Sequence, residues 1–260
     1  MMSSRVMLLM TAVLASLLTA GGCVDNLKNP PKPAEEYYKD GDFYYTKGNF
    51  YRALTMYSQA INKNGNFAAA WAGFGDVHRE LAVVDFQNAA KEKAANEHLV
   101  QSKWAFENAL KRDSGLSRAV YGMGKLYYEK SVHLADAPVW KEEGKAYATP
   151  EDRKAWARKG VESLKRALAG GNKQEEFYRW SHRYLGILYT VLGRFPEARE
   201  AFTIFQQYSR ETMDFLQKQK PPDEKEKTEV ETRMMVLRKD MEDVDALIAD
   251  LEKRQAAGGK

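Results

Sequence analysis

The residue types in this chain that most readily do chemistry are histidines and one glycine-rich stretch. No two of the four histidines stand in an H-E-x-x-H motif or four residues apart, the spacing at which two imidazoles on one helix bind zinc. They are His78, His98, His133 and His182. The stretch from Gly122 to Lys125 is similar to part of a phosphate-binding loop, but Ala119 and Leu126 replace its first glycine and its Ser/Thr. A G-x-S-x-G nucleophile motif is also missing from the sequence, which therefore predicts no enzyme, no cofactor and no metal site.

The chain has one cysteine, Cys23, and its position indicates processing rather than a disulfide. A positive charge at Arg5 precedes an uncharged, mostly apolar run of 15 residues from Val6 to Ala20. That run is short for a membrane-spanning helix, and small residues follow it up to Cys23. The alternative is an ordinary signal-peptidase site beside an incidental cysteine.

The end of this run resembles the lipobox of bacterial lipoproteins, whose signal peptide is cut before a cysteine that receives a diacylglyceryl group and an N-acyl group. Ala20 departs from the leucine that the family more often has there. The resemblance implies a signal peptide at 1–22 and a palmitate-type anchor on Cys23, which stably holds a protein on a bilayer. Because Val24 and not Asp follows the cysteine, it also implies the outer membrane, facing the periplasm. The proline-rich residues 23–33 are predicted to be an extended tether.

Beyond the tether, small and aromatic residues recur at helical spacing, and strand-like alternation is nearly absent, so we expect an all-α protein. Residues 34–67 should form two helices joined by a turn at Lys47-Gly48-Asn49, where glycine can adopt the left-handed conformation. The residues that repeat at spacings of four and three are Tyr37, Gly41 and Tyr44, then Ala53, Tyr57 and Ala60.

These residues resemble the tetratricopeptide repeat (TPR), a helix-turn-helix unit of 34 residues. Asp40 and Gly65 depart from the Leu and Pro of the family pattern. Later repeats are marked by glycines at the place of Gly41, namely Gly75, Gly124 and Gly186. The resemblance implies an all-α, TPR-type α-solenoid over residues 34–210, with about four helix-turn-helix repeats, two of which carry inserts.

The two inserts differ in composition. The first, at 82–101, is rich in Ala, Glu and Lys without Gly or Pro, and it predicts one long helix from about Val84 to Lys111. The second, at 130–156, predicts an irregular loop followed by a helix capped by Thr149-Pro150. In the last repeat Phe205 replaces a small residue, which predicts looser packing there.

Residues 211–260 form a separate, highly charged segment with apolar residues at strict four-three spacing, which predicts one helix from about 223 to 255. The seam consists of Val230, Met234, Leu237, Met241, Val244, Ile248 and Leu251. It suits a helix that caps the solenoid, and it also suits self-association or a partner helix.

In TPR proteins the first helices of the repeats line a concave groove that binds a peptide or a partner helix. The resemblance implies that the groove residues here are Tyr38, Asp42, Tyr45, Ala72, Asp76, Arg79, Tyr121, Lys125, Tyr128, Arg183 and Ile187. Tyr38 and Asp42 stand where TPR domains that clamp the chaperone carboxylate carry Lys and Asn, so that ligand is not expected.

The formal net charge is only +4, from 40 basic and 36 acidic residues that are mixed along the chain, which does not favour nucleic-acid binding. We therefore expect a membrane-anchored TPR scaffold that binds another envelope protein. In layout it is similar to the pilotins of type IV pili and to the TPR lipoprotein of the β-barrel assembly machinery. The alternative is an envelope enzyme or small-ligand receptor that uses Trp140, Tyr147 and the central inserts as a lid.

Overall fold

The structure is a computed structural model that describes residues 32–86, 92–132, 149–171 and 176–256. Every regular element in these ranges is a helix, as the sequence predicts. The helices are α2 (Ala34–Thr46), α3 (Phe50–Lys63), α4 (Ala68–Phe86), α5 (Glu92–Arg112), α6 (Ser117–Val132), α7 (Pro150–Gly170), α8 (Glu176–Val191), α9 (Phe195–Lys218) and α10 (Glu224–Ala256). The predicted signal peptide, Cys23, most of the tether, His133, Trp140 and Tyr147 lie outside the described residues.

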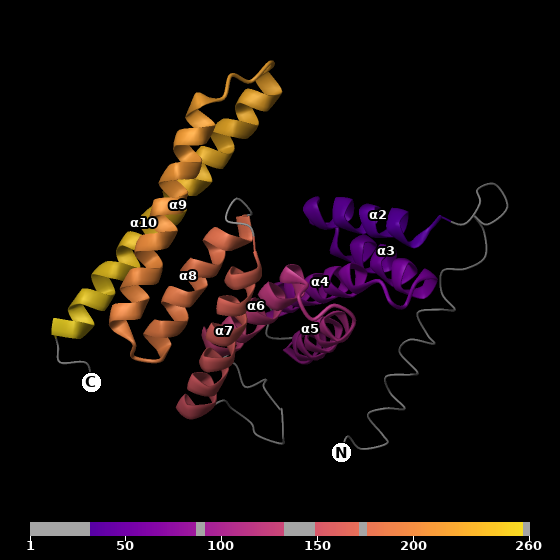
Figure 1. The fold of residues 1–260 in the computed structure, drawn as a ribbon, viewed down its shortest axis with the longest axis horizontal. Coiled ribbons are helices and arrows are strands. Elements are labelled where there is room, and N and C mark those ends of the chain that lie inside the picture. Colours follow the sequence, from indigo (N-terminus) through magenta and orange to yellow (C-terminus); the bar gives the residue numbers. More distant parts are fainter. Residues whose placement is uncertain (1–31, 87–91, 133–148, 172–175, 257–260) are drawn as a thin grey trace.

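The first eight of these helices form four successive hairpins, α2–α3, α4–α5, α6–α7 and α8–α9, stacked along the long axis of the molecule (Figure 1). The first helix of each hairpin packs against the first helix of the next, so α2, α4, α6 and α8 together form one side of the stack. This arrangement confirms the predicted α-solenoid of four hairpins.

Buried aromatic rings hold neighbouring hairpins together, because glycines leave space for them. The ring of Tyr57 on α3 lies between Gly41 on α2 and Gly73 on α4, where an added Cβ would come within 2.6 Å and 2.5 Å of it. Phe106 on α5 lies in the same way between Gly75 and Gly122. The close approach of backbone to ring explains why these positions exclude any side chain.

The turns and caps follow the sequence predictions. Gly48 and Gly193 end their helices with positive φ angles of 69° and 72°. Thr149 and Asp152 form a reciprocal capping box at the start of α7, with Pro150 in the first helical turn. The lengthened α7, with 21 residues against 14 in α3, also confirms the prediction for that helix.

The first insert lengthens two helices rather than one, so the predicted single helix from Val84 to Lys111 is wrong. Val84 belongs to α4, which has 19 residues, and α5 begins only at Glu92. Ala82 on α4 and Leu99 on α5 are both buried in one core cluster, with Phe86 packed against it, so the added turns of the two helices share one apolar interface. An Ala-, Glu- and Lys-rich composition favours helix throughout and does not mark where one helix ends and the next begins.

Helix α10 lies beside α9 in the antiparallel direction at the end of the stack (Figure 1), which confirms the predicted C-terminal helix and its capping position. Leu237, Val244 and Leu251 of the heptad seam are buried, and Val244 and Leu251 share a core cluster with residues of α9, so this part of the seam packs against the chain itself. The boundary we set between residues 210 and 211 falls inside α9.

The predicted looser packing at Phe205 is also wrong. This side chain is fully buried in the same core as Val244 of α10, and its ring lies 5.9 Å from that of Trp180. The cap helix supplies the contacts that a following repeat would otherwise give, so a large residue fits there. Among the described residues, no helix has both the length and the apolar character needed to span a membrane.

Candidate partner-binding face

All eleven predicted groove residues lie on α2, α4, α6 and α8, the four helices that form one side of the stack. Their exposure divides them into two groups. Partly exposed are Tyr38, Asp42, Tyr45, Tyr121, Lys125, Arg183 and Ile187. Buried are Ala72, Asp76, Arg79 and Tyr128. We call the partly exposed group the inner-face residues; the buried group lies beneath them.

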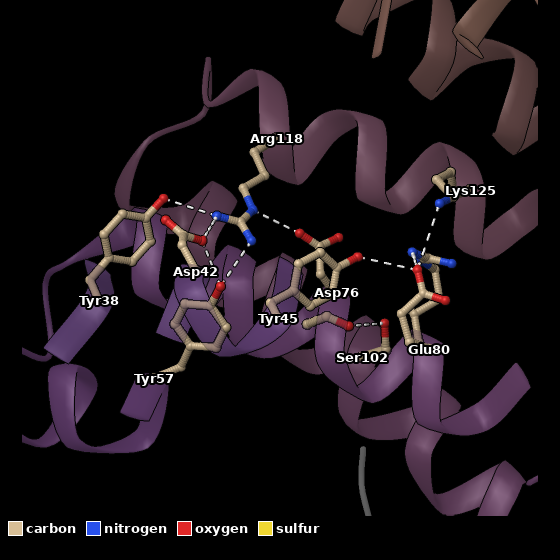
Figure 2. Close-up of polar contacts among 11 residues, drawn as sticks. Tyr38, Asp42, Tyr45, Tyr57, Asp76, Glu80, Ser102, Arg118 and Lys125 are labelled. Atoms are coloured by element: carbon tan, nitrogen blue, oxygen red, sulfur yellow. Dashed lines mark hydrogen bonds and ion pairs between the residues drawn. The ribbon is translucent and has the colours of Figure 1, made fainter. Parts of the chain in front are cut away.

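An arginine that the sequence analysis did not single out connects three hairpins on this face. Arg118, in the first turn of α6, forms ion pairs of 2.7 Å with both Asp42 on α2 and Asp76 on α4. It also donates hydrogen bonds to the hydroxyls of Tyr38, at 2.9 Å, and Tyr57, at 3.2 Å. Figure 2 shows the guanidinium between these groups.

Arg118 lies three residues before Tyr121 and seven before Lys125, so helical spacing alone places it on the same face of α6. That spacing could have found it. The family pattern assigns groove residues only from the middle of each first helix, and it therefore misses a residue one turn earlier.

A second group of charges centres on Glu80 of α4, another residue that the sequence analysis did not single out. One carboxylate oxygen accepts a hydrogen bond from the Tyr45 hydroxyl at 3.2 Å, pairs with the Arg79 guanidinium, and lies 3.9 Å from the Lys125 ammonium (Figure 2). Burial and the neighbouring charge of Arg79 lower the pKa of Lys125 to about 8. Burial alone would raise the pKa of Glu80, but Arg79 and Lys125 reverse the effect and lower it.

Aromatic rings continue the face toward α8. The ring of Tyr184 on α8, a residue that the sequence analysis missed, lies 4.6 Å from that of Tyr128 and 6.3 Å from that of Tyr121. The Lys125 ammonium lies 5.7 Å from the Tyr184 ring, within cation–π range. At the far edge Arg183 lies 3.8 Å from Asp243 of α10, so the cap helix borders the inner face.

The charged groups of this face pair with one another. Charges on the face balance within the chain, with Arg79, Arg118 and Lys125 against Asp42, Asp76 and Glu80. In the part of the chain that the structure describes, no three His, Cys, Asp or Glu side chains are placed to hold a metal ion. Two shallow depressions, of about 440 and 420 Å³, lie elsewhere, one at the α2–α3 turn and the end of α4 and the other between α7 and the α8–α9 turn.

No protein-family model matches this chain, and no curated protein matches it. Among solved structures it is similar to TTC0263, a thermophilic TPR protein of Thermus thermophilus. The two are 12% identical with a TM-score of 0.50, over 86% of this chain and 97% of that one. The fold is that of a TPR solenoid.

Two further structures overlap less closely. The MamA protein is 16% identical with a TM-score of 0.43, over 86% of this chain and 94% of that one. PilF of Pseudomonas aeruginosa is 14% identical with a TM-score of 0.34, over 86% of this chain and 97% of that one.

Proposed function

We propose that this TPR protein is a lipid-anchored scaffold of the bacterial envelope that binds another envelope protein on its inner face. The observation that carries the binding proposal is the row of partly exposed tyrosines and charged groups on α2, α6 and α8, which lie on one side of the stack. Tyrosine offers a large rigid ring and a hydroxyl at low entropic cost, and it is common at the centres of protein interfaces.

The partner surface that fits this face is an extended or helical peptide with a few apolar anchors and few charges. Tyr45 and Tyr121 are partly exposed and offer aromatic contacts, and Ile187 offers an aliphatic contact. Because the charges of the face already pair with one another, a strongly charged partner would gain little there and would disturb those pairs.

Photo-crosslinking tests which face binds the partner. A photoreactive phenylalanine analogue at Ile187 on the inner face should capture one protein from detergent-solubilised envelopes. The same analogue at Val100, which is exposed on the outer helix α5, should capture none. The substitution adds a probe without removing a buried ring, so both variants are expected to fold.

A truncation set supports the same test. Changing Tyr38, Tyr45 and Tyr121 to Ala should reduce co-purification of the partner at least tenfold. These rings also pack beside the cores, so some loss of stability is expected and a thermal melt must accompany the pull-down. The matched control changes Tyr37, Tyr44 and Tyr51, three tyrosines of α2 and α3 that are not inner-face residues. Capture of the partner through Val100, or full recovery by a folded inner-face variant, would place recognition on another surface.

The membrane anchor is a separate part of the proposal, and it rests on the sequence around Cys23. Cys23→Ser should abolish incorporation of radiolabelled palmitate and leave the protein unprocessed or released from the membrane, because no thiol remains for the diacylglyceryl group. The readout is autoradiography with membrane fractionation. Equal membrane retention of a cleaved, unlabelled Cys23→Ser protein would contradict lipid anchoring.

At the finer level, we propose a role in the assembly or secretion of envelope machinery, with delivery to the outer membrane facing the periplasm. The competing proposal is an envelope enzyme or a small-ligand receptor that uses the inserts at 82–101 and 130–156. Recovery of one stoichiometric protein in the pull-down supports the scaffold. A protein that purifies alone with a bound small molecule supports the receptor.

A further inference from the structure

The second hairpin contains a buried pair of histidines that the binding proposal does not use. The Nδ1 atom of His78 on α4 lies 2.9 Å from the Nδ1 atom of His98 on α5. His78 is only 7% exposed, and its ring also lies 4.6 Å from that of Phe74. On the other side of His98, Nε2 lies 3.7 Å from a carboxylate oxygen of Asp85, which is itself buried.

This geometry is a hydrogen bond between two imidazoles. One Nδ1 donates its proton and the other accepts it, so the contact requires that one facing nitrogen remain unprotonated. If both rings become charged, two N–H groups face each other at the same distance and the contact becomes repulsive. The pair is not arranged as a metal site, because Asp85 faces the nitrogen of His98 that points away from His78.

The histidine pair lies where the extra helical turns of this hairpin begin. His78 stands at the place that tyrosine occupies in the other three repeats, as Tyr44, Tyr127 and Tyr189. The added turns of α4 and α5 follow directly, and Ala82, Phe86 and Leu99 pack in one apolar cluster between them. A side chain that titrates near neutral pH therefore stands at this repeat position only in the hairpin with this extension.

We propose that the His78–His98 pair is an acid-sensitive latch that holds the extended ends of α4 and α5 together at neutral pH and releases them in mild acid. The device acts locally, since the glycine-and-aromatic contacts that join this hairpin to its neighbours contain no titrating group in this pH range. The latch therefore controls how stably residues 79–86 of α4 and 93–99 of α5 remain folded against each other.

The sign of the pH dependence follows from the surroundings of both rings. Burial, and then the neighbouring His98, lowers the pKa of His78 to about 3. Burial also lowers the pKa of His98, although Asp85 and Glu97 oppose this shift. Asp85 is the charged group on α4 that acts on the pair. From the helices packed on α4, the group that acts on His78 is His98, and the group that acts on His98 is Glu97, both on α5.

In the open state both histidines should have their ordinary pKa, near 6.5. A histidine whose pKa is lowered in the closed state stabilises that state fully above pH 6.5, and its contribution is lost as the pH falls from 6.5 toward 3. Between pH 7.5 and pH 5.5 one such histidine raises the open population about tenfold.

Hydrogen exchange of the full-length protein tests the latch. Amide protection factors in 79–86 and 93–99, corrected for the intrinsic pH dependence of exchange, should fall at least tenfold between pH 7.5 and pH 5.5. The double variant His78→Gln with His98→Gln should show no such fall, because two amides can donate and accept at either pH. His182→Gln is the matched control: it removes a different buried histidine, on α8, and should leave the acid response of α4 and α5 unchanged.

Three results would overturn the proposal. They are unchanged protection of the two segments at pH 5.5, an equal loss of protection in all helices, and an equal local loss in the Gln double variant. Should the double variant fail to fold, the single variant His98→Gln replaces it in the experiment, because it removes one of the two titrating groups. It should then respond less steeply to pH than the wild type, and an identical response would reject the latch.

Discussion

Replacing Tyr57 by alanine should lower the Tm of the protein by roughly 10 °C, since truncating a buried aromatic costs ~3–5 kcal/mol and each kcal/mol shifts the Tm of a chain of this size by ~2–4 °C. The Tyr57 side chain is completely buried. Its ring fills the space left by Gly41 of its own hairpin and Gly73 of the next, so removal opens a cavity at the junction of two repeats. Neither glycine carries a side chain that could move into that space.

Differential scanning calorimetry with two control variants separates the contributions of Tyr57. Tyr57→Phe keeps the ring and loses only the hydroxyl contacts to Asp42 and Arg118, so it should cost about 1 kcal/mol. Tyr51→Ala removes a tyrosine of the same helix that is 66% exposed, and it should change the Tm by no more than a degree or two. Equal melting of Tyr57→Ala and Tyr51→Ala would show that the glycine-lined junction does not hold the repeats together.

The repeat pattern could be predicted from the sequence because it depends on local spacing. Gly41 and Tyr57 mark one hairpin wherever the chain lies in space, and the turn at Gly48 needs a residue that tolerates positive φ. The second set of packing glycines, Gly73 and Gly122, was missed, because their partners are rings of the preceding hairpin. Contacts between hairpins depend on how successive hairpins pack, and no spacing within one hairpin reports that packing.

The sequence predicts which positions lie on the inner side of the stack, but it does not predict which of their side chains are exposed. Helical spacing places Arg79 and Tyr128 on the right side of their helices, yet both are buried because α4, α6 and α8 lie close together. Arg118 and Glu80 organise the charges of this face, and each acts on residues of other helices. Such pairing depends on distances between repeats, which periodicity does not encode.

The C-terminal helix illustrates a different limit. A four-three seam such as that from Val230 to Leu251 suits any helical surface that offers complementary holes. The chain supplies that surface itself on α9, and two side-chain contacts also join the helices: Arg199 with Glu252 at 2.8 Å and Gln206 with Asp245 at 2.6 Å. The sequence shows the seam, and only the structure shows which surface fills it.

Replacing Arg118 by methionine should lower the Tm by about 4–12 °C, from a loss of ~2–3 kcal/mol. Methionine keeps much of the side-chain volume and removes the charge, which leaves Asp42 and Asp76 without their shared cation and the Tyr38 and Tyr57 hydroxyls without their donor. The loss is set below the usual cost of breaking a fully buried pair, because the side chains of Arg118 and Asp42 are 26% and 37% exposed.

The matched control for Arg118 is Arg199→Met on α9. Arg199 pairs with Glu252 at 2.8 Å, nearly the distance of the Arg118 pairs, but both partners are more than half exposed. Its loss should therefore move the Tm by only a degree or two, because water and salt screen an exposed pair. Changing Asp42 and Asp76 to Asn in the Arg118→Met background should restore at least half of the lost Tm, since the unpaired carboxylates then carry no charge. If Arg118→Met and Arg199→Met melt alike, the cluster around Arg118 is a surface feature and does not join the first three repeats.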